Sequence, residues 1–337
     1  MNGYHLRLAG VVGAASLALS LAACTSVQTG SQPSGSAGAT DITIAGVFGN
    51  TFDPFWTSLG CGAAAQAKEA GVTYKEFASS SADTTAFDQS FNSATLINPT
   101  GILVNPLNPD QFVSQYQTLM QKGVPVVTIN GSTPPAQYKI VGTDVENLDF
   151  LPDLVDLIPK DDGKLAVIDG VPGLVPVTSR LDPVVKAILD GRPGLTALET
   201  QYTTFDTAKA TQAVNSLIVG NPDLRVIVAS NGPDGAATAA AVKAAGKAGE
   251  IAVIALDATP PEVAALKDGT ITALVAQAPK KIGAEQVKTL VDYLSSQNTA
   301  AAIEPSEDKV GVPQKLLTKD NVDDPDNSDW VYTAECK

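Results

Sequence analysis

The chain has 337 residues, and 22 Lys and Arg against 36 Asp and Glu give it a formal net charge of -14. This acidic balance argues against a nucleic-acid partner, because phosphate binding needs clustered Lys and Arg. The only histidine, His5, lies in a stretch that we expect to be removed, which excludes a Ser-His-Asp triad and a His-based metal site in the mature protein. We therefore expect no metal and no cofactor, and the length predicts about two domains.

Residues 1–23 are typical of an export signal, because Arg7 precedes an unbroken run of small apolar residues. This run is shorter than the roughly 20 residues that a transmembrane helix needs. It ends in Leu21-Ala22-Ala23-Cys24, which resembles the lipobox of bacterial lipoproteins. The resemblance implies that Cys24 is acylated and anchors an extracytoplasmic protein to the bacterial cell membrane. The alternative is an ordinary secretory signal with a chance cysteine.

Residues 24–40 are rich in Ser, Gly, Gln, Thr, Pro and Ala, a composition that predicts a flexible linker. Beyond it, short β-rich runs alternate with helical patterns in two consecutive series, which predicts an α/β fold of two similar Rossmann-like domains with parallel sheets. The expected strands are 42–48, 72–77, 101–105 and 124–130, then 164–169, 196–202, 226–230, 252–257 and 271–277. The expected helices are 55–70, 111–122, 182–189, 208–219, 236–248 and 261–267.

Three helix starts carry a capping side chain before a proline: Asp53-Pro54, Asn108-Pro109 and Thr259-Pro260. Thr259 and Glu262 are spaced as a capping box. In open α/β sheets, ligands bind outside the carboxyl ends of the strands, so the polar and aromatic residues that follow the strands are the candidates for a site. They include Asp53, Phe55 and Trp56, then Asn105, Asn130, Arg180 beyond Gly170-Val171, Phe205, Asn231, Asp257 and Gln277.

These residues, in this order and spacing, resemble the bacterial type I sugar-binding proteins, the ribose- and galactose-binding family of ABC importers. The resemblance covers about residues 42–305. Its most specific motifs are Asp53-Pro54-Phe55-Trp56, Gly142-Thr143-Asp144, Asn231, Leu256-Asp257-Ala258-Thr259-Pro260 and Ala276-Gln277-Ala278-Pro279.

The resemblance implies two lobes joined by a three-strand hinge, with a ligand cleft between them (the type I periplasmic binding protein fold). The N-lobe would take residues 41–143 and 278–306, and the C-lobe 144–277 and 307–319, followed by an acidic tail, 320–337. The chain would cross between the lobes near Thr143-Asp144, Gln277-Ala278 and Ser306.

The resemblance also assigns roles in the cleft. Phe55, Trp56 and Phe205 match its stacking residues, and Asp53, Asn105, Asn130, Arg180, Asn231, Asp257 and Gln277 match its hydroxyl-binding set, with Val171 beside them. Structural roles are the alternatives. Asp53 could cap a helix, Phe55 and Trp56 could be core residues, and Arg180 could pair with Asp182 at the surface. Asn231 and Gln277 could serve the hinge, and Asp257 could be structural.

One pair departs from the family, because Asn130-Gly131 stands where a charged Asp-Arg pair is common, and Gly49 likewise replaces a frequent polar residue. We therefore expect a monosaccharide or sugar alcohol held more by the C-lobe and delivered to an ABC permease by a monomeric protein. The competing interpretations are a sensory binding protein, a nucleoside-binding protein and a glycoside hydrolase. A phosphate loop at Gly170-Val171-Pro172-Gly173 lacks the Lys-Ser/Thr ending.

With Cys24 acylated, Cys61 and Cys336 remain in an oxidising compartment. We expect a disulfide that attaches the acidic tail to the N-lobe. The alternative is two unpaired thiols.

Overall fold

The computed structural model describes residues 42–49, 53–79, 84–105, 108–296 and 301–336. The expected signal peptide, Cys24 and the linker lie outside these residues and stay predictions. Within the described ranges, no helix has the length and apolar character to cross a membrane.

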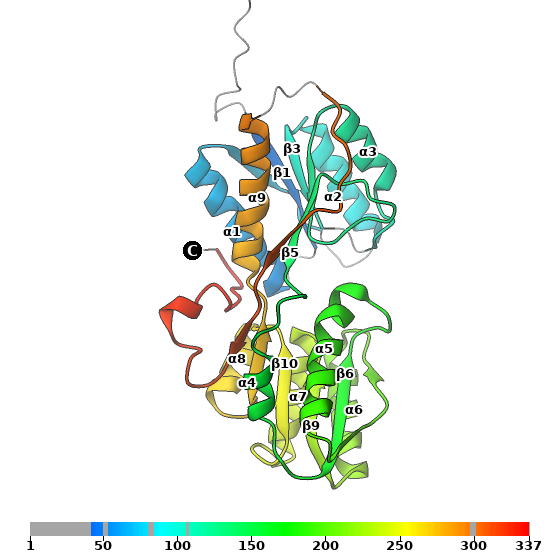
Figure 1. Ribbon diagram of the computed structural model, residues 1–337, viewed down its shortest axis with the longest axis vertical. Helices are drawn as coiled ribbons and strands as arrows, with labels where there is room; N and C mark the ends of the chain where they lie inside the picture. Colours follow the sequence, from blue (N-terminus) through cyan, green and yellow to red (C-terminus); the bar gives the residue numbers. More distant parts are fainter. Residues whose placement is uncertain (1–41, 50–52, 80–83, 106–107, 297–300, 337) are drawn as a thin grey trace, which may run out of the picture. The chain divides into compact units, whose positions relative to one another are not determined.

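The first sheet has the strand order β12-β5-β4-β3-β1-β2 and is parallel throughout. Its strands are β1 (Thr43–Val47), β2 (Thr73–Glu76), β3 (Gly101–Val104), β4 (Val126–Thr128), β5 (Lys139–Thr143) and β12 (Lys309–Val312). Helices α1 (Pro54–Ala70) and α9 (Pro279–Ser296) cover one face, and α2 (Thr84–Leu96) and α3 (Val113–Gln121) cover the other (Figure 1). We call this unit the N-lobe.

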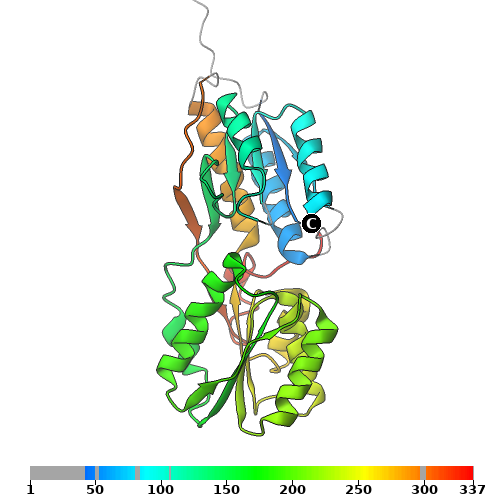
Figure 2. The same cartoon turned by 90° about the vertical axis from the view of Figure 1, so that its right-hand side faces the viewer.

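The second sheet has the order β13-β11-β10-β9-β6-β7, with β8 also paired to β6. Its strands are β6 (Gly163–Asp169), β7 (Leu195–Ala197), β8 (Gln201–Tyr202), β9 (Leu224–Ala229), β10 (Ala252–Leu256), β11 (Ala273–Ala276) and the antiparallel β13 (Lys315–Leu317). Helices α4 (Leu151–Asp156) and α5 (Val175–Gly191) pack on one face, and α6 (Thr207–Gly220), α7 (Gly232–Ala244) and α8 (Pro260–Lys267) on the other (Figure 2). We call this unit the C-lobe.

Both sheets are doubly wound in the same way, since β1 lies between β2 and β3 in the first sheet and β6 lies between β7 and β9 in the second. The central strands read as continuous apolar runs because helices bury both of their faces, as in β3 and β10, where every residue is buried. The α/β fold with two similar, mainly parallel sheets is therefore confirmed. In such sheets the carboxyl ends of the strands beside the change of direction form the usual ligand crevice.

Helix α1 is held closely against α9, which fixes the position of the residues at its start. A side chain at Gly62 would collide with the backbone of Lys280, and one at Gly283 with the backbone of Leu59. The two glycines thus allow the helix backbones to touch, and Figure 1 shows the two helices side by side.

Three local expectations are wrong. Asn108-Pro109 begins a turn, and α3 begins only at Val113. Helix α5 begins at Val175 and continues through Pro183, a residue that normally interrupts a helix and so hides this one in the sequence. The segment 307–319 does not belong wholly to the C-lobe, because β12 pairs with β5 in the N-lobe sheet and only β13 joins the C-lobe sheet.

Candidate ligand-binding site

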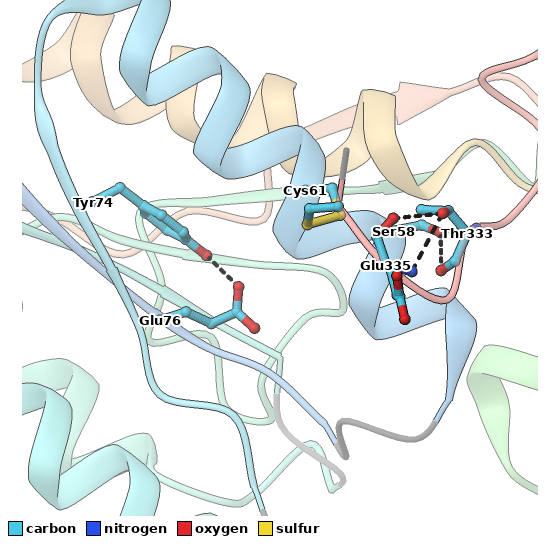
Figure 3. The surroundings of a disulfide bond; sticks show 7 residues. Ser58, Cys61, Tyr74, Glu76, Thr333 and Glu335 are labelled. Atoms are coloured by element: carbon cyan, nitrogen blue, oxygen red, sulfur yellow. Dashed lines mark hydrogen bonds between the residues drawn. A yellow bond between two sulfur atoms is a disulfide. The ribbon is translucent and has the colours of Figure 1, made fainter.

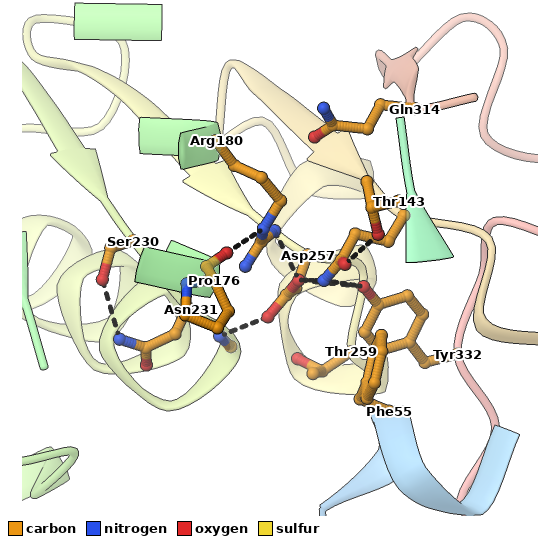
Figure 4. Close-up of polar contacts among 12 residues, drawn as sticks. Phe55, Thr143, Pro176, Arg180, Ser230, Asn231, Asp257, Thr259, Gln314 and Tyr332 are labelled. Atoms are coloured by element: carbon orange, nitrogen blue, oxygen red, sulfur yellow. Dashed lines mark hydrogen bonds and ion pairs between the residues drawn. The ribbon is translucent and has the colours of Figure 1, made fainter. Parts of the chain in front are cut away.

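Three segments connect the lobes, and hydrogen bonds join them to one another. The first follows β5 at Thr143, the second follows β11 at Gln277, and the third lies between β12 and β13 at Gln314 rather than near Ser306 as expected. The Thr143 hydroxyl donates to Oε1 of Gln277, and Nε2 of Gln314 donates to the carbonyl of Asp144 at 2.9 Å. The crossings therefore form one bonded unit, part of which is drawn in Figure 4.

Asp257 is the centre of the polar groups at this hinge. It follows β10 and has a φ of 123°, a backbone conformation that residues other than glycine rarely adopt. Its Oδ1 accepts from Arg180 at 3.1 Å, Gln277 at 2.9 Å and Tyr332 at 2.9 Å, while its Oδ2 accepts from the backbone N–H of Gly232 at 3.2 Å. These bonds hold a strained residue in place, and strain of this kind is concentrated at functional sites. We call Thr143, Arg180, Asp257, Gln277 and Tyr332 the Asp257 cluster.

Arg180 reaches Asp257 from α5 in the C-lobe. Its side chain is 6% exposed, and besides the ion pair its Nε donates to the carbonyl of Pro176 at 3.3 Å. The alternative of a surface pair with Asp182 is therefore wrong. Taking both charges out of water costs free energy. Close pairing and further hydrogen bonds offset this cost, and this geometry provides both.

Two further carboxyl groups lie in the electrostatic field of Asp257. Burial, and then the charge of Asp257, raise the pKa of Glu262. Its carboxylate accepts from the Thr259 backbone N–H, as expected for the capping box, and also from the Thr259 hydroxyl. Burial also raises the pKa of Asp53 to about 6, opposed by the hydrogen bond from the Phe55 N–H and assisted by the charge of Asp257. The site therefore concentrates acidic groups around one guanidinium, and Asp53 titrates near neutral pH.

A second polar network lies at the ends of β6, β8 and β9. The Asn231 side chain caps α7 by accepting from the backbone of Asp234 at 3.0 Å, and its Nδ2 donates to Ser230 and Asp234. The Thr203 hydroxyl donates to Asp234 at 2.8 Å, and the Ser230 hydroxyl donates to Asp169 at 2.6 Å. Burial raises the pKa of Asp234. Asn231 is thus held by the cap that starts its own helix, which gives this residue a structural role.

The three aromatic candidates differ in how they are held. Phe55 is buried on α1, with its ring 4.9 Å from Trp56 and 5.9 Å from Tyr332, both edge-on. The Trp56 indole lies over Gly49, where any side chain would collide with it. Trp56 therefore fills the space that a polar side chain at position 49 would need. Phe205 has a φ of 59°, lies against Gly170 and remains 40% exposed. An exposed ring on a strained turn is suited to stacking on a ligand.

The remaining candidates are not brought together in the same way. Asn105 is fully buried and its Oδ1 accepts from Gln286 of α9 at 3.2 Å, which places it inside the N-lobe. Its Nδ2 is a buried donor with no partner among the described residues. Asn130 and Val171 are half-buried at the ends of β4 and β6. Gly131, next to Asn130, contributes no side chain at this edge of the N-lobe.

Sequence reasoning missed two members of the Asp257 cluster. Thr143 was within a recognised motif but had no role assigned. Tyr332 comes from the expected acidic tail, is 3% exposed and is one of two aromatic residues that precede Cys336. The available signal was an aromatic residue four positions before a cysteine in a segment otherwise rich in aspartate.

The disulfide between Cys61 and Cys336 is present, with the two Cα atoms 5.3 Å apart (Figure 3). Beside it the Thr333 N–H donates to the Ser58 hydroxyl at 2.7 Å. The end of the chain is therefore attached to α1 of the N-lobe. Among the described residues, no group of three or more His, Cys, Asp or Glu side chains is placed to hold a metal ion.

Comparison with known proteins agrees with this fold. A periplasmic binding protein domain model matches residues 44–298. The D-allose-binding periplasmic protein of Escherichia coli (strain K12) is 27% identical over 251 residues, which cover 71% of this chain and 80% of that protein. The ribose import binding protein of Bacillus subtilis (strain 168) is 26% identical over 293 residues, covering 86% and 91%.

Solved structures show the same fold. An ABC transporter solute-binding protein from Agrobacterium vitis, bound with α-D-tagatopyranose, superposes with a TM-score of 0.73 at 25% identity and covers 87% of this chain and 99% of its own. A second Agrobacterium vitis solute-binding protein, with bound D-fucose, gives 0.72 at 24% identity and covers 86% and 100%.

Proposed function

Because this chain belongs to the periplasmic binding protein family, we propose that it captures a monosaccharide or sugar alcohol outside the cytoplasm and delivers it to an ABC permease. The observation that carries the proposal is the Asp257 cluster, a buried set of a carboxylate, a guanidinium and an amide at the hinge, flanked by Phe55 on the N-lobe side. Vicinal hydroxyls match paired polar groups, and the C–H faces of a sugar ring match aromatic rings. The allose- and ribose-binding relatives support this class of ligand.

In this proposal the ligand binds first to the C-lobe, where Arg180, Asp257 and Gln277 are already held in place by their mutual hydrogen bonds. Contacts with Phe55, Trp56 and Asp53 then add binding energy only when the N-lobe approaches. A ligand shifts a hinge equilibrium by its difference in affinity for the two states, so these contacts favour the closed form. The permease would recognise that closed form. No residue is assigned a catalytic role, and the ligand should be recovered unchanged.

The experiment is a thermal-shift and calorimetric screen of the protein from residue 41 onward. The panel holds D-ribose, D-allose, D-tagatose, D-fucose and D-arabinose, with sugar alcohols and nucleosides as further classes. A ligand at 100 times its Kd stabilises the folded state by about 2.7 kcal/mol, which raises Tm by several degrees.

Asp257→Asn is the test variant, and Asp190→Asn, at an exposed ion pair on α5, is its matched control. We expect the response to disappear only in Asp257→Asn. A response to nucleosides alone would change the proposed ligand class from sugars to nucleosides. Equal binding by Asp257→Asn and the wild type would remove the Asp257 cluster from the site. Chemical conversion of a bound ligand would favour an enzyme.

We also propose that Cys24 carries the lipid anchor. Cys24→Ala should move the protein from the membrane fraction to the soluble extracytoplasmic fraction, because acyl chains provide the membrane affinity. Membrane association that survives this substitution would contradict the anchor without affecting the sugar-binding proposal.

A further inference from the structure

The C-terminal segment, residues 318–336, makes a fourth connection between the lobes. It leaves the C-lobe after β13, and Asp323 pairs with Lys267 of α8 at 2.5 Å. Trp330 then donates from Nε1 to the carbonyl of Pro313 at 3.1 Å, in the third crossing, with Lys281 of α9 over its ring. The segment ends at the disulfide to α1. The chain end thus joins C-lobe, hinge and N-lobe in sequence.

This segment contacts the rest of the chain at separated points. Together with α1, α8 and α9 it borders an open hollow of about 760 Å³, lined by residues such as Gln66, Val263 and Ala284. Val322 and Tyr332 of this segment belong to the buried apolar core, and the disulfide adds a covalent attachment at its end.

At the hinge the segment inserts one side chain, Tyr332. Its N–H donates to the carbonyl of Ala258 at 3.0 Å, its hydroxyl donates to Oδ1 of Asp257, and Gln277 donates to that hydroxyl at 3.5 Å. Burial and the charge of Asp257 raise the pKa of Tyr332 well above its usual value, so the hydroxyl remains a donor. Figure 4 shows Tyr332 next to Phe55, on the N-lobe side of Asp257.

Three donors on one oxygen fix the orientation of the Asp257 carboxylate. Oδ1 accepts from Arg180, Gln277 and Tyr332, which uses its acceptor capacity. Oδ2 accepts from the Gly232 N–H among the described residues, which leaves capacity for one further donor such as a ligand hydroxyl. The donors of Oδ1 come from α5, the second crossing and the C-terminal segment, so the segment helps to decide where Oδ2 points.

We propose that Tyr332 is a positioning residue of the ligand site, and that the Cys61–Cys336 disulfide holds it there. The proposal rests on the sugar-binding function given above and extends the site to a segment outside the two sheets. Tyr332 sets the direction of Asp257 Oδ2 and thereby the preference between sugars that differ at one hydroxyl group.

The test compares Tyr332→Phe with Tyr116→Phe. Both substitutions remove one buried hydroxyl and keep the ring, but the Tyr116 hydroxyl in the N-lobe has no partner among the described residues. Affinities for D-ribose and D-arabinose, which differ in configuration at C2, are measured by calorimetry together with Tm. Tyr332→Phe should weaken binding of the preferred sugar roughly tenfold and change the ratio of the two Kd values, because it removes a hydrogen bond to a charged group. Tyr116→Phe should change neither.

A third variant, Cys61→Ser/Cys336→Ser, tests the role of the disulfide. It should weaken binding in the same direction, and adding Tyr332→Phe to it should have little further effect, because both changes act through the same contact. Unaltered binding in this variant would overturn the positional task of the disulfide.

The outcomes separate the two proposals. Wild-type protein that binds no sugar of the larger panel would overturn the proposed function, and a ligand role for Tyr332 with it. If the wild type binds sugar and Tyr332→Phe leaves the ratio of the two Kd values unchanged, the positioning role alone is overturned. An equal loss for both sugars accompanied by a lower Tm would assign Tyr332 to the stability of the fold.

Discussion

The two sides of the proposed site are built in different ways. On the C-lobe side, Arg180, Asp257 and Gln277 are bonded to one another and are each less than a tenth exposed. On the N-lobe side, the start of α1 presents Phe55, Trp56 and the half-buried capping residue Asp53, and Asn130 is followed by glycine. One side is therefore a preorganised polar surface and the other a mainly apolar cover. Preorganisation lowers the entropy lost on binding, so the C-lobe is the side expected to select the ligand.

Breaking the polar side should give the largest effect. Arg180→Ala would leave Asp257 buried without its counter-charge, and breaking a buried pair in this way costs about 3–5 kcal/mol. We expect sugar binding to be lost and unfolding to occur at lower denaturant concentration. Lys186→Ala on the same helix is the control, because its pair with Asp190 is exposed and contributes little. Full affinity in Arg180→Ala would place the ligand elsewhere.

Removing the covalent link between the C-terminal segment and α1 is the next test. The disulfide joins residues 275 positions apart, so its loss removes a constraint on a very long loop of the unfolded chain. Cys61→Ser/Cys336→Ser should lower the free energy of unfolding by about 2–5 kcal/mol, measured by denaturant titration. Reduction of the wild type should reproduce the loss. Two thiols that react with alkylating reagent before reduction would show instead that the bridge does not form.

The acid on the apolar side should give a pH-dependent effect. Burial raises the pKa of Asp53 from 3.8 to about 6, so the folded protein binds this proton more tightly than the unfolded chain. The resulting stabilisation is complete below about pH 4 and is lost as the pH rises through about 6. Asp53→Asn keeps a capping side chain and should be more stable than the wild type by about 1–3 kcal/mol at pH 7.5. The difference should shrink toward pH 4, and a pH-independent difference would contradict the shift.

The smallest effect should come from the exposed ring. Phe205→Ala removes a side chain that is 40% exposed, so Tm should change little while sugar affinity falls about tenfold, from lost stacking. Val219→Ala, at an 82% exposed apolar residue of α6, is the control for surface truncation. Equal affinity of Phe205→Ala and the wild type would leave stacking to the N-lobe aromatics alone.

Much of this could be predicted from local patterns. Buried parallel strands read as apolar runs, and Asp53-Pro54 and Thr259-Pro260 mark real helix starts, because burial on both faces and capping are short-range effects. The Cys61–Cys336 pairing followed from the small number of cysteines. By contrast, the expected helix 182–189 is shorter than α5, because Pro183 is tolerated in a helix whose apolar face packs on the sheet.

Long-range contacts decided the rest. The strand β12 is short, with exposed Lys309 and Gly311, and only its pairing with β5 makes it part of the N-lobe. Asn105 follows a strand as other candidates do, yet its amide faces α9, since the direction of a side chain depends on the helix packed against it.

By itself, the sequence determined the α/β class, the doubled domain, the positions of most strand ends and the polar and aromatic residues that follow them. These follow from periodicity and burial, which act over a few residues. Only the tertiary structure decided that Arg180 pairs with Asp257 and that Tyr332, from a segment expected to be a tail, joins them. Residues 77 and 75 positions apart in sequence meet there because the fold brings α5, β10 and the chain end to one hinge.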